Sequence, residues 1–306
     1  MVDTSVIIPC YNSADTLGLQ LESLSRQQDC APFEVVIVDN CSTDSTGDIA
    51  LRWDKKLNLR IVVANDHQGV SYARNRGIAE ATGQKLVFID ADDAVPPEYI
   101  GYCQRSLDEY PVYVGGFDPV DEAEFLRGLD HVLSLVAHKT LDYKSPLPSE
   151  QDPFWPIVPG CSFGALKSVM LEVGGFDITM EPGAEDNDLA FRLISAGYEL
   201  RVQRSTTIAY RTNNQQRPFS VYYKRAKSVA LLAERHKVWN RAPVSVRKPV
   251  KSFLITLGAG TKILLTQPKN IKGWLPRLAM SSGLLGGWVS YRVLKCSLPP
   301  RLGVGL

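Results

Sequence analysis

The stretch Lys85–Asp93, with the sequence KLVFIDADD, decides the fold class of this 306-residue chain. It is a short apolar run that ends abruptly in three acids, Asp90, Asp92 and Asp93. The apolar part is typical of a strand buried on both faces, as in a parallel sheet. Open α/β sheets bind ligands beyond the carboxyl ends of their strands, so these acids are expected at a ligand site. A solvated turn is the alternative for an isolated DxDD.

The spacing of Asp90 and Asp92 indicates a metal. Two carboxylates one residue apart repel each other unless a cation, or donors to both, lies between them. A hard divalent cation with oxygen ligands suits this position, and such ions commonly bind through one or two carboxylates plus substrate phosphates. The pattern therefore predicts Mn2+ or Mg2+ beside a phosphate-bearing ligand.

Three more apolar runs precede this strand at similar intervals, with helix-compatible segments between them. Strands alternating with helices of this length predict βαβ units, a parallel sheet and right-handed crossovers. The expected fold class is α/β, with a Rossmann-like, mainly parallel sheet flanked by helices. The expected strands are Ser5–Ile8, Glu34–Val38, Arg60–Ala64 and Lys85–Ile89, and the expected helices are Ala14–Gln28, Ser45–Leu57 and Val70–Ala81.

Polar loops follow the first two expected strands. Pro9–Asn12 comes after the first, and Asp39 directly follows the VVIV run of the second. Ordinary helix N-cap chemistry accounts for residues 42–45. Asp39 is less easily explained as a cap, and its carboxylate can accept a hydrogen bond from a nucleobase or a ribose.

A second acidic cluster, Glu185-Asp186, lies in the segment PGAEDNDLAFRL. The apolar stripe through Leu189 and Leu193 predicts a helix whose first turn holds Asp186. Acids at a helix N-terminus are often only capping groups or favoured by the helix dipole. We interpret Asp188 as structural, and the residues alone leave the role of Asp186 open.

Four segments together resemble the family 2 glycosyltransferases: IIPCYNSADTL, EVVIVDNCSTDST, GVSYARNRGIAEATGQKLVFIDADD, and GGFD followed by EDNDLAFRLISAGYEL. They cover about the first two-thirds of the chain, and their order and spacing fit that family. The resemblance implies a GT-A fold, a nucleoside-diphosphate sugar donor, a divalent metal and inversion at the anomeric carbon. The family's default donor is a UDP-sugar.

The resemblance also implies roles for individual residues. Asp186 matches the general base, and Glu185 would position an acceptor hydroxyl. Asp92 matches the metal ligand, and Arg74, in the ARN segment, would meet the diphosphate, where positive charge stabilises the leaving group. The nucleotide-binding positions that it implies are Pro9, Tyr11, Asp39, Arg74 and Asp90.

The chain departs from the family pattern at one position. Family members often carry a metal-ligand histidine downstream of the base, and here that position is Tyr210, in IAYRTN. A neutral phenol is a poor ligand for a divalent metal at neutral pH. A subset of the family has Tyr–Arg at this point, which leaves open whether Arg211 grips the diphosphate directly.

Charge is unevenly distributed along the chain. Residues 1–234 hold all 33 acids beside 21 Lys and Arg, for a net charge of −12, whereas residues 235–306 hold 13 Lys and Arg and no acid. This C-terminal segment also contains apolar runs and the tryptophans Trp239, Trp274 and Trp288.

Two interpretations of residues 235–306 remain. Basic, tryptophan-bearing amphipathic segments favour a helix lying in the interface of an anionic membrane. The longest uncharged stretch, Leu278–Tyr291, has 14 residues, short of the roughly 18 that a spanning helix needs. The alternative is a subdomain that packs its basic face on the acidic catalytic domain. No nucleic-acid recognition motif accompanies the charge.

The expected organisation has three parts. Residues 1–118 would form the nucleotide-sugar-binding half of the GT-A domain, residues 119–234 the acceptor-binding half, and residues 235–306 a helical, membrane-associating extension. Six cysteines without CxxC or metal spacing indicate reduced thiols, and the N-terminus shows no signal peptide. The expected location is cytoplasmic, peripheral at the inner face of the cell membrane.

The sequence thus predicts an inverting glycosyltransferase of polysaccharide biosynthesis, acting on a hydroxyl of a glycan or lipid-linked acceptor. A non-catalytic nucleotide-sugar-binding protein is one alternative, and the presence of Asp92 with Glu185 and Asp186 argues against it. A sugar nucleotidyltransferase is the other. It would need a Gly-rich phosphate loop after the first strand, and Pro9–Asn12 offers none.

Overall fold

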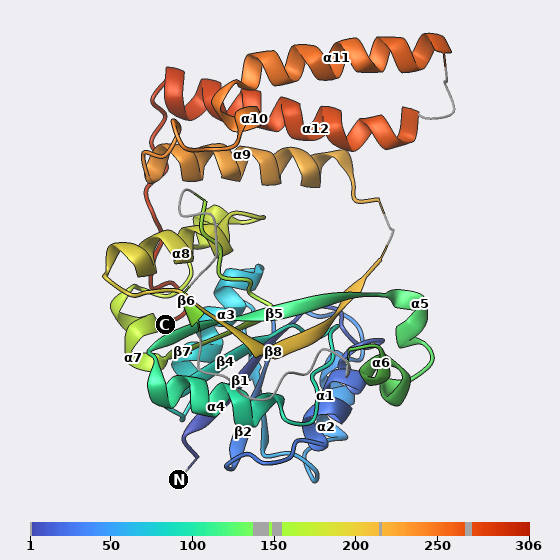
Figure 1. Ribbon diagram of the computed structural model, residues 1–306, viewed down its shortest axis with the longest axis vertical. Helices are drawn as coiled ribbons and strands as arrows, with labels where there is room; N and C mark the ends of the chain where they lie inside the picture. Colours follow the sequence, from blue (N-terminus) through green and yellow to red (C-terminus); the bar gives the residue numbers. More distant parts are fainter. Residues whose placement is uncertain (1, 137–146, 149–154, 214–215, 267–270) are drawn as a thin grey trace.

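A mainly parallel β-sheet forms the body of the protein, with helices on both faces and a layer of helices stacked at one end (Figure 1). The computed structural model describes residues 2–136, 147–148, 155–213, 216–266 and 271–306. Within them the sheet has eight strands, in the order β3-β2-β1-β4-β7-β5-β8-β6. The expected α/β fold is confirmed.

The first half of the chain alternates strands and helices as predicted. The strands are parallel and rich in buried apolar side chains, because both faces of the sheet are covered. The expected helices exist, and two of them are shorter than expected. The elements are β1 (Thr4–Cys10), α1 (Leu17–Ser25), β2 (Phe33–Asp39), α2 (Thr46–Leu51), β3 (Leu59–Val63), α3 (Val70–Glu80) and β4 (Lys85–Ile89).

The second half adds an antiparallel strand in the middle of the sheet. β7 pairs antiparallel with both β4 and β5, and β5 pairs in parallel with β8. The rings of Phe88 and Phe163 stack with centroids 4.3 Å apart across the β4–β7 pair. The elements are α4 (Tyr99–Glu109), β5 (Val112–Asp121), α5 (Glu122–Phe125), α6 (Leu129–Val136), β6 (Leu147–Pro148), β7 (Ser162–Leu166), α7 (Lys167–Glu172), the 3-10 helix η2 (Ile178–Met180), α8 (Glu185–Ser195) and β8 (Arg201–Thr212).

Two apolar clusters fill the space on either side of the sheet. One packs α3, α7 and α8 on the sheet and includes Ile78, Met170 and Leu189. The other packs α1, α2 and α4 on the opposite face and includes Leu21 and Tyr99. All of these side chains are buried, so both faces contribute to the core.

A layer of helices stands apart from the sheet, with α12 between α9 and α11 (Figure 1). Gly283 and Gly287 lie on α12, and a side chain at either would overlap the backbone or a side chain of α9. These glycines therefore permit the close approach of the two helices. The elements are α9 (Phe219–Arg235), α10 (Val244–Arg247), α11 (Pro249–Thr266), α12 (Ile271–Gly287) and a π-helical turn, η4 (Trp288–Val293).

The C-terminal extension was expected to begin at residue 235. The helical layer begins earlier in the chain, with α9 at Phe219. Among the described residues, no helix is long and apolar enough to cross a membrane. After η4 the chain leaves the layer and returns to the body. There the N–H of Gly303 donates to the carbonyl of Gly174 at 2.9 Å, and the N–H of Arg301 to Asp177 Oδ1 at 3.1 Å.

Asn75 joins this returning tail to the body. Its Nδ2 donates to the carbonyls of Phe176 and Val304, both at 2.9 Å, and its Oδ1 accepts the N–H of Phe176 at 2.8 Å. The side chain is fully buried, so water cannot replace these bonds. One amide thus satisfies three backbone groups from two distant segments.

We predict that Asn75→Ala lowers the free energy of unfolding by about 3 kcal/mol or more, because each buried polar group left unpaired costs about 1–3 kcal/mol. Urea denaturation, analysed by linear extrapolation, measures the change. The exposed Asn58 is the matched control, and Asn58→Ala should change stability by less than about 0.5 kcal/mol. Equal stabilities for the two variants would contradict the bridging role of Asn75.

Candidate active site

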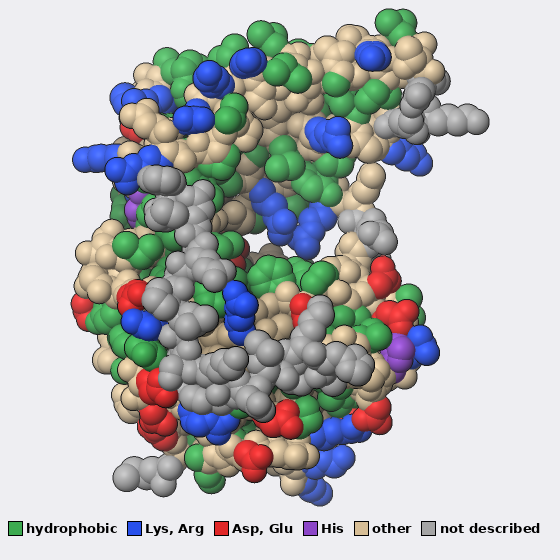
Figure 2. All heavy atoms as spheres, in the orientation of Figure 1, with side chains coloured by type: hydrophobic (Ala, Val, Ile, Leu, Met, Phe, Trp, Pro, Cys, Tyr) green, Lys and Arg blue, Asp and Glu red, His purple; other side chains and the backbone are tan. Residues whose placement is uncertain are grey.

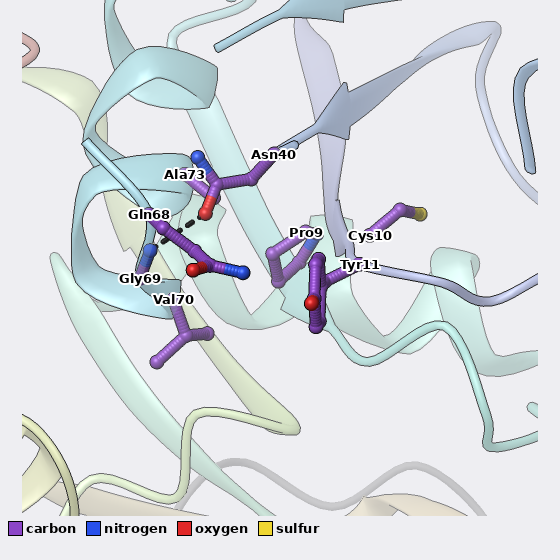
Figure 3. Close-up of a pocket in the computed structure, with 8 residues that line it drawn as sticks. All are labelled: Pro9, Cys10, Tyr11, Asn40, Gln68, Gly69, Val70 and Ala73. Atoms are coloured by element: carbon purple, nitrogen blue, oxygen red, sulfur yellow. Dashed lines mark hydrogen bonds between the residues drawn. The ribbon is translucent and has the colours of Figure 1, made fainter. Parts of the chain in front are cut away.

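A pocket of about 220 Å³ opens where the carboxyl ends of β1 and β2 meet the start of α3 (Figure 3). Two of the expected nucleotide-binding residues, Pro9 and Tyr11, line it. Tyr11 is 53% exposed, so a ring face is open to a ligand. The lining residues are Pro9, Cys10, Tyr11, Asn40, Gln68, Gly69, Val70 and Ala73.

Asn40 shapes the wall of this pocket. Its Oδ1 accepts the N–H of Gly69 at 2.6 Å (Figure 3). Its Nδ2 donates to the carbonyls of His67, at 2.7 Å, and Ala64. The neighbouring Asp39 accepts the N–H of Ser42 at 3.1 Å, which holds the turn after β2. Asp39 is adjacent to the pocket wall and is not one of its lining residues.

Arg74 is the buried centre of the site, only 3% exposed. Its Nη2 lies 3.1 Å from Asp90 Oδ1 and its Nη1 lies 3.4 Å from Asp186 Oδ1. The guanidinium also lies 5.2 Å from the centre of the Phe176 ring. One cation therefore brings together the acid at the end of β4 and the acid at the start of α8.

Gly160 makes this arrangement possible. A side chain at Gly160 would overlap the guanidinium of Arg74, so only glycine leaves room for it. Its N–H also donates to Asp186 Oδ2 at 3.0 Å, and the N–H of Val158 donates to the carbonyl of Asp186 at 3.3 Å. The loop before β7 thus orients both oxygens of Asp186 together with Arg74.

Burial raises the pKa of Asp186 to about 6. Arg74 opposes this shift, and the negative charge of Glu185 adds to it. Glu185 accepts the N–H groups of Gly183 and Ala184 at 2.5 and 2.9 Å, and burial raises its pKa as well. A carboxylate that titrates near neutrality suits a general base.

Asp188 has a structural role, as expected from the sequence. It accepts hydrogen bonds from Arg192 Nε at 2.7 Å and pairs with His236 Nε2 at 2.8 Å. Burial opposes its charge, but the bonds from His236 and Arg192 outweigh burial and lower its pKa. The group therefore ties α8 to the end of α9.

The acids after β4 occupy different environments. Asp92 is exposed at the surface, yet partial loss of hydration and the charge of Asp90 raise its pKa to about 6. Asp93 is fully buried, and its Oδ1 accepts the N–H of Arg211 at 2.9 Å. Its Oδ2 has no hydrogen-bond partner within the described ranges, and burial raises its pKa strongly.

One further group of possible metal-ligand atoms was not predicted from the sequence. Carboxylate oxygens of Asp90 and Asp93 and the sulfur of Cys161 lie within 4.8 Å of one another, whereas Asp92 is not in this group. Burial raises the pKa of the Cys161 thiol, which keeps it neutral. The sequence gives no signal for this contact, because Cys161 reaches Asp90 only through the β4–β7 pairing.

Arg211 holds the acidic loop in place, and its neighbour Tyr210 packs on β5. Arg211 Nε donates to the carbonyl of Asp92 at 2.8 Å, and its guanidinium lies 4.1 Å from the centre of the Phe125 ring. The ring of Tyr210 packs beside Phe117, with centroids 5.6 Å apart. In this structure Arg211, on β8, therefore supports the loop that carries Asp92 and Asp93.

Glu181 is another residue that the sequence did not indicate. Its carboxylate accepts the N–H of Ser71 in the first turn of α3, beside Gly69 of the pocket. Burial raises its pKa. An acid in this position is favoured by the helix dipole.

Together, the sheet, the pocket at its carboxyl edge and the paired acids define an α/β protein of the GT-A type. Residues 5–174, more than half of the chain, match the family model described as Glycosyl transferase family 2. The chain belongs to this family.

Known proteins share both sequence and fold with it. A "PGL/p-HBAD biosynthesis glycosyltransferase" of Mycobacterium bovis is 40% identical over 118 residues, which are 38% of this chain and 43% of that protein. The match therefore spans less than half of that relative's length.

Two solved structures match nearly the whole chain. S. aureus TarS in complex with UDP-GlcNAc matches with a TM-score of 0.57 at 18% identity, over 95% of this chain and 92% of that chain. The mannosyltransferase PcManGT of Pyrobaculum calidifontis, in complex with GDP-Man and Mn2+, matches with a TM-score of 0.55 at 20% identity, over 96% and 88%. These likenesses show the GT-A fold.

We predict that Gly160→Ala displaces Arg74 and lowers donor turnover by roughly tenfold to a hundredfold, the cost of a misplacement of about 1 Å in an active site. Turnover is measured as nucleotide release from the nucleotide sugar that binds best with Mn2+. Gly47→Ala is the control, since a side chain there meets nothing within 4 Å. Wild-type turnover in Gly160→Ala would show that the packing around Arg74 does not matter.

Proposed function

We propose that this protein is an inverting glycosyltransferase. It moves a sugar from a nucleoside-diphosphate sugar, with a UDP-sugar as the default donor, to a hydroxyl of a glycan or lipid-linked acceptor. The observation that carries the proposal is the contact of Arg74 with both Asp90 and Asp186, since the two acids proposed for the donor side and for the base then lie within one site. The nucleotide sugars held by TarS and PcManGT support the donor class.

The donor nucleotide would occupy the pocket at the carboxyl ends of β1 and β2. Pro9 and the exposed ring of Tyr11 would contact the base, and Asp39 would accept a base N–H. Asp90 would lie near the ribose. Aromatic faces stack on bases, and the open face of Tyr11 is available for this contact.

Asp92 would hold a divalent cation, Mn2+ or Mg2+. Three acids follow β4 at this place, and hard divalent cations take oxygen ligands. Asp93 Oδ2, buried without a partner in the described part of the chain, is a further oxygen there, whereas the neutral thiol of Cys161 is a poor ligand for such a cation. When bound, the cation would supply positive charge that neutralises the leaving diphosphate.

Asp186 would act as the general base. It would accept the proton of the acceptor hydroxyl as that oxygen forms a bond to the anomeric carbon. The bond from this carbon to the diphosphate oxygen breaks on the opposite side, its electron pair leaves with the diphosphate, and the configuration inverts. Glu185 would position the acceptor hydroxyl, and Arg74 would hold Asp186 in its charged form and face the diphosphate side.

We also propose a role in this reaction for each of the three expected parts of the chain. Residues 1–118 supply the proposed donor contacts, and residues 119–234 supply Asp186. Residues 235–306, with 13 basic and no acidic residues, would hold the enzyme on the inner face of an anionic membrane, where a lipid-linked acceptor of polysaccharide biosynthesis is available.

We predict that Asp186→Asn lowers kcat by at least about a hundredfold, the low end for a general base, and leaves donor affinity nearly unchanged. The base acts on the acceptor proton, so ground-state donor contacts survive. Wild-type kcat/KM should fall as the pH drops below about 6, because protonation of Asp186 removes the base. Steady-state kinetics and calorimetry with the nucleotide sugar measure both effects.

With saturating Mn2+, which would keep Asp92 deprotonated, the variant should lose this acid limb of the pH profile. Asp188→Asn is not a suitable control, because Asp188 supports the fold. Near-normal turnover in Asp186→Asn would assign the base elsewhere, with Glu185 as the first candidate.

We predict that Asp92→Asn abolishes the part of donor binding that depends on Mn2+, while the fold is retained because this side chain is exposed. Calorimetric titration of the nucleotide sugar, with and without Mn2+, measures the loss. The exposed Asp54 serves as the control, and Asp54→Asn should bind like wild type. Normal Mn2+-dependent binding by Asp92→Asn would refute the metal assignment.

A further inference from the structure

Helix α11 carries an apolar stripe that nothing in the described structure covers. Its apolar side chains recur at intervals of three, four and seven residues, which places them on one face of about 100°. Leu254 is 60% exposed and Leu265 is 86% exposed, so this face is open over the whole helix. The stripe consists of Val250, Leu254, Leu257, Leu264 and Leu265.

The flank of α11 beside this stripe packs on α12. Trp274 Nε1 of α12 donates to the carbonyl of Thr256 at 2.7 Å. A side chain at Gly260 would overlap the Trp274 ring, and Gly260 is buried. Leu257, next to this contact, is 37% exposed and less open than Leu254 and Leu265, so the stripe is most open on the side away from α12. Helix α11 is the outermost helix of the layer (Figure 1).

Cations border the stripe. Lys251 and Lys262 are both exposed and lie eleven residues apart, on the same side of the helix. Where α11 begins, a groove of about 460 Å³ combines cations with an apolar floor. Its lining residues are Arg247, Lys248, Pro249, Val250, Lys251, Leu254, Ile255 and Trp288.

We propose that α11 is the membrane-docking helix of this protein and that its apolar stripe inserts into the interface of an anionic phospholipid bilayer. Lys251 and Lys262 would then contact headgroup phosphates, and the groove would take a lipid headgroup among Arg247, Lys248 and Lys251. An exposed apolar face bordered by lysines is the pattern of helices that lie in a membrane interface. This inference rests on the proposed membrane association and assigns it to one surface.

Charge favours a bilayer over a second copy of the chain as the partner. Residues 235–306 hold 13 Lys and Arg and no acid, so two such surfaces would repel each other. Figure 2 shows basic and apolar side chains together over the helical layer, with acidic side chains gathered on the body below. An anionic headgroup layer complements this surface.

The test is co-sedimentation of the full chain with vesicles of phosphatidylcholine plus phosphatidylglycerol, and with pure phosphatidylcholine vesicles. Leu254→Asp/Leu265→Asp should weaken binding to the anionic vesicles by about tenfold or more, because apolar burial is lost and negative charge is added. Leu126→Asp/Leu171→Asp makes the same change at exposed leucines of the body, and should bind like wild type.

A second variant tests the cations. Lys251→Gln/Lys262→Gln should lose roughly fivefold per lysine on anionic vesicles, and binding of the wild type should weaken as salt is added. Donor hydrolysis should stay at the wild-type rate in all of these variants, because none of the substituted residues lines the donor pocket. This readout keeps the docking surface separate from the proposed enzymatic activity.

Each other outcome overturns part of the account. Equal binding of wild type and Leu254→Asp/Leu265→Asp would remove α11 as the docking surface and leave membrane binding to another region. Absence of wild-type binding to either vesicle would overturn both membrane proposals. Light scattering gives the oligomeric state. If the wild type is a dimer and Leu254→Asp/Leu265→Asp is a monomer, the stripe pairs two copies of the chain instead.

Discussion

The ion pairs of Arg74 are the interaction on which the candidate active site depends. A buried guanidinium is tolerated only when carboxylates or other acceptors compensate the loss of water. Asp90 and Asp186 do so at 3.1 and 3.4 Å, and Gly160 leaves the space that the guanidinium fills. The same contacts fix the direction of Asp186 and limit the rise of its pKa. The Arg74 ion pair therefore affects both the position and the protonation of the proposed base.

Helix α3 connects these ion pairs to several other parts of the fold. Gly69 and Val70 at its start border the pocket, and Arg74 in its middle reaches the two acids. The next residue, Asn75, binds the returning C-terminal tail, so the end of the chain is attached one residue from the centre of the site. Gly77 lies against Ile7 of β1, where a side chain would overlap. A displacement of α3 would thus disturb the pocket, the acids and the tail together.

Local sequence patterns were sufficient for the elements of the first half of the chain. Lys85–Ile89 forms a strand with the expected bounds, and the acids after it lie at the carboxyl edge of the sheet. The start of α8 also agrees with the interpretation of Asp186 as a first-turn residue. These features depend on periodicity and on short-range chemistry, which a single sequence displays.

The contacts that complete the site could not be predicted in the same way. Asn40, Gly160 and Cys161 act on residues 24 or more positions away. The contacts of Gly160 and Cys161 also depend on the antiparallel pairing of β7 with β4. Arg74 was expected to face a diphosphate, and the structure pairs it with two acids; a role at the diphosphate remains a prediction. Of the Pro-rich segment 144–159, residues 144–146 and 149–154 lie outside the described residues, and Leu147–Pro148 form β6.

The most direct test of this account is the pH dependence of kcat/KM in Arg74→Gln, since that profile reports the ionisation of the free enzyme. Loss of the Arg74 charge should move the acid limb to higher pH, because only the hydrogen bond from Gly160 would then oppose the rise in the pKa of Asp186 that burial and Glu185 cause. Arg76→Gln removes the same charge two residues away, where the side chain pairs with Glu80, and should leave the limb in place. An acid limb in Arg74→Gln that coincides with the wild-type limb would contradict the claim that Arg74 controls the base.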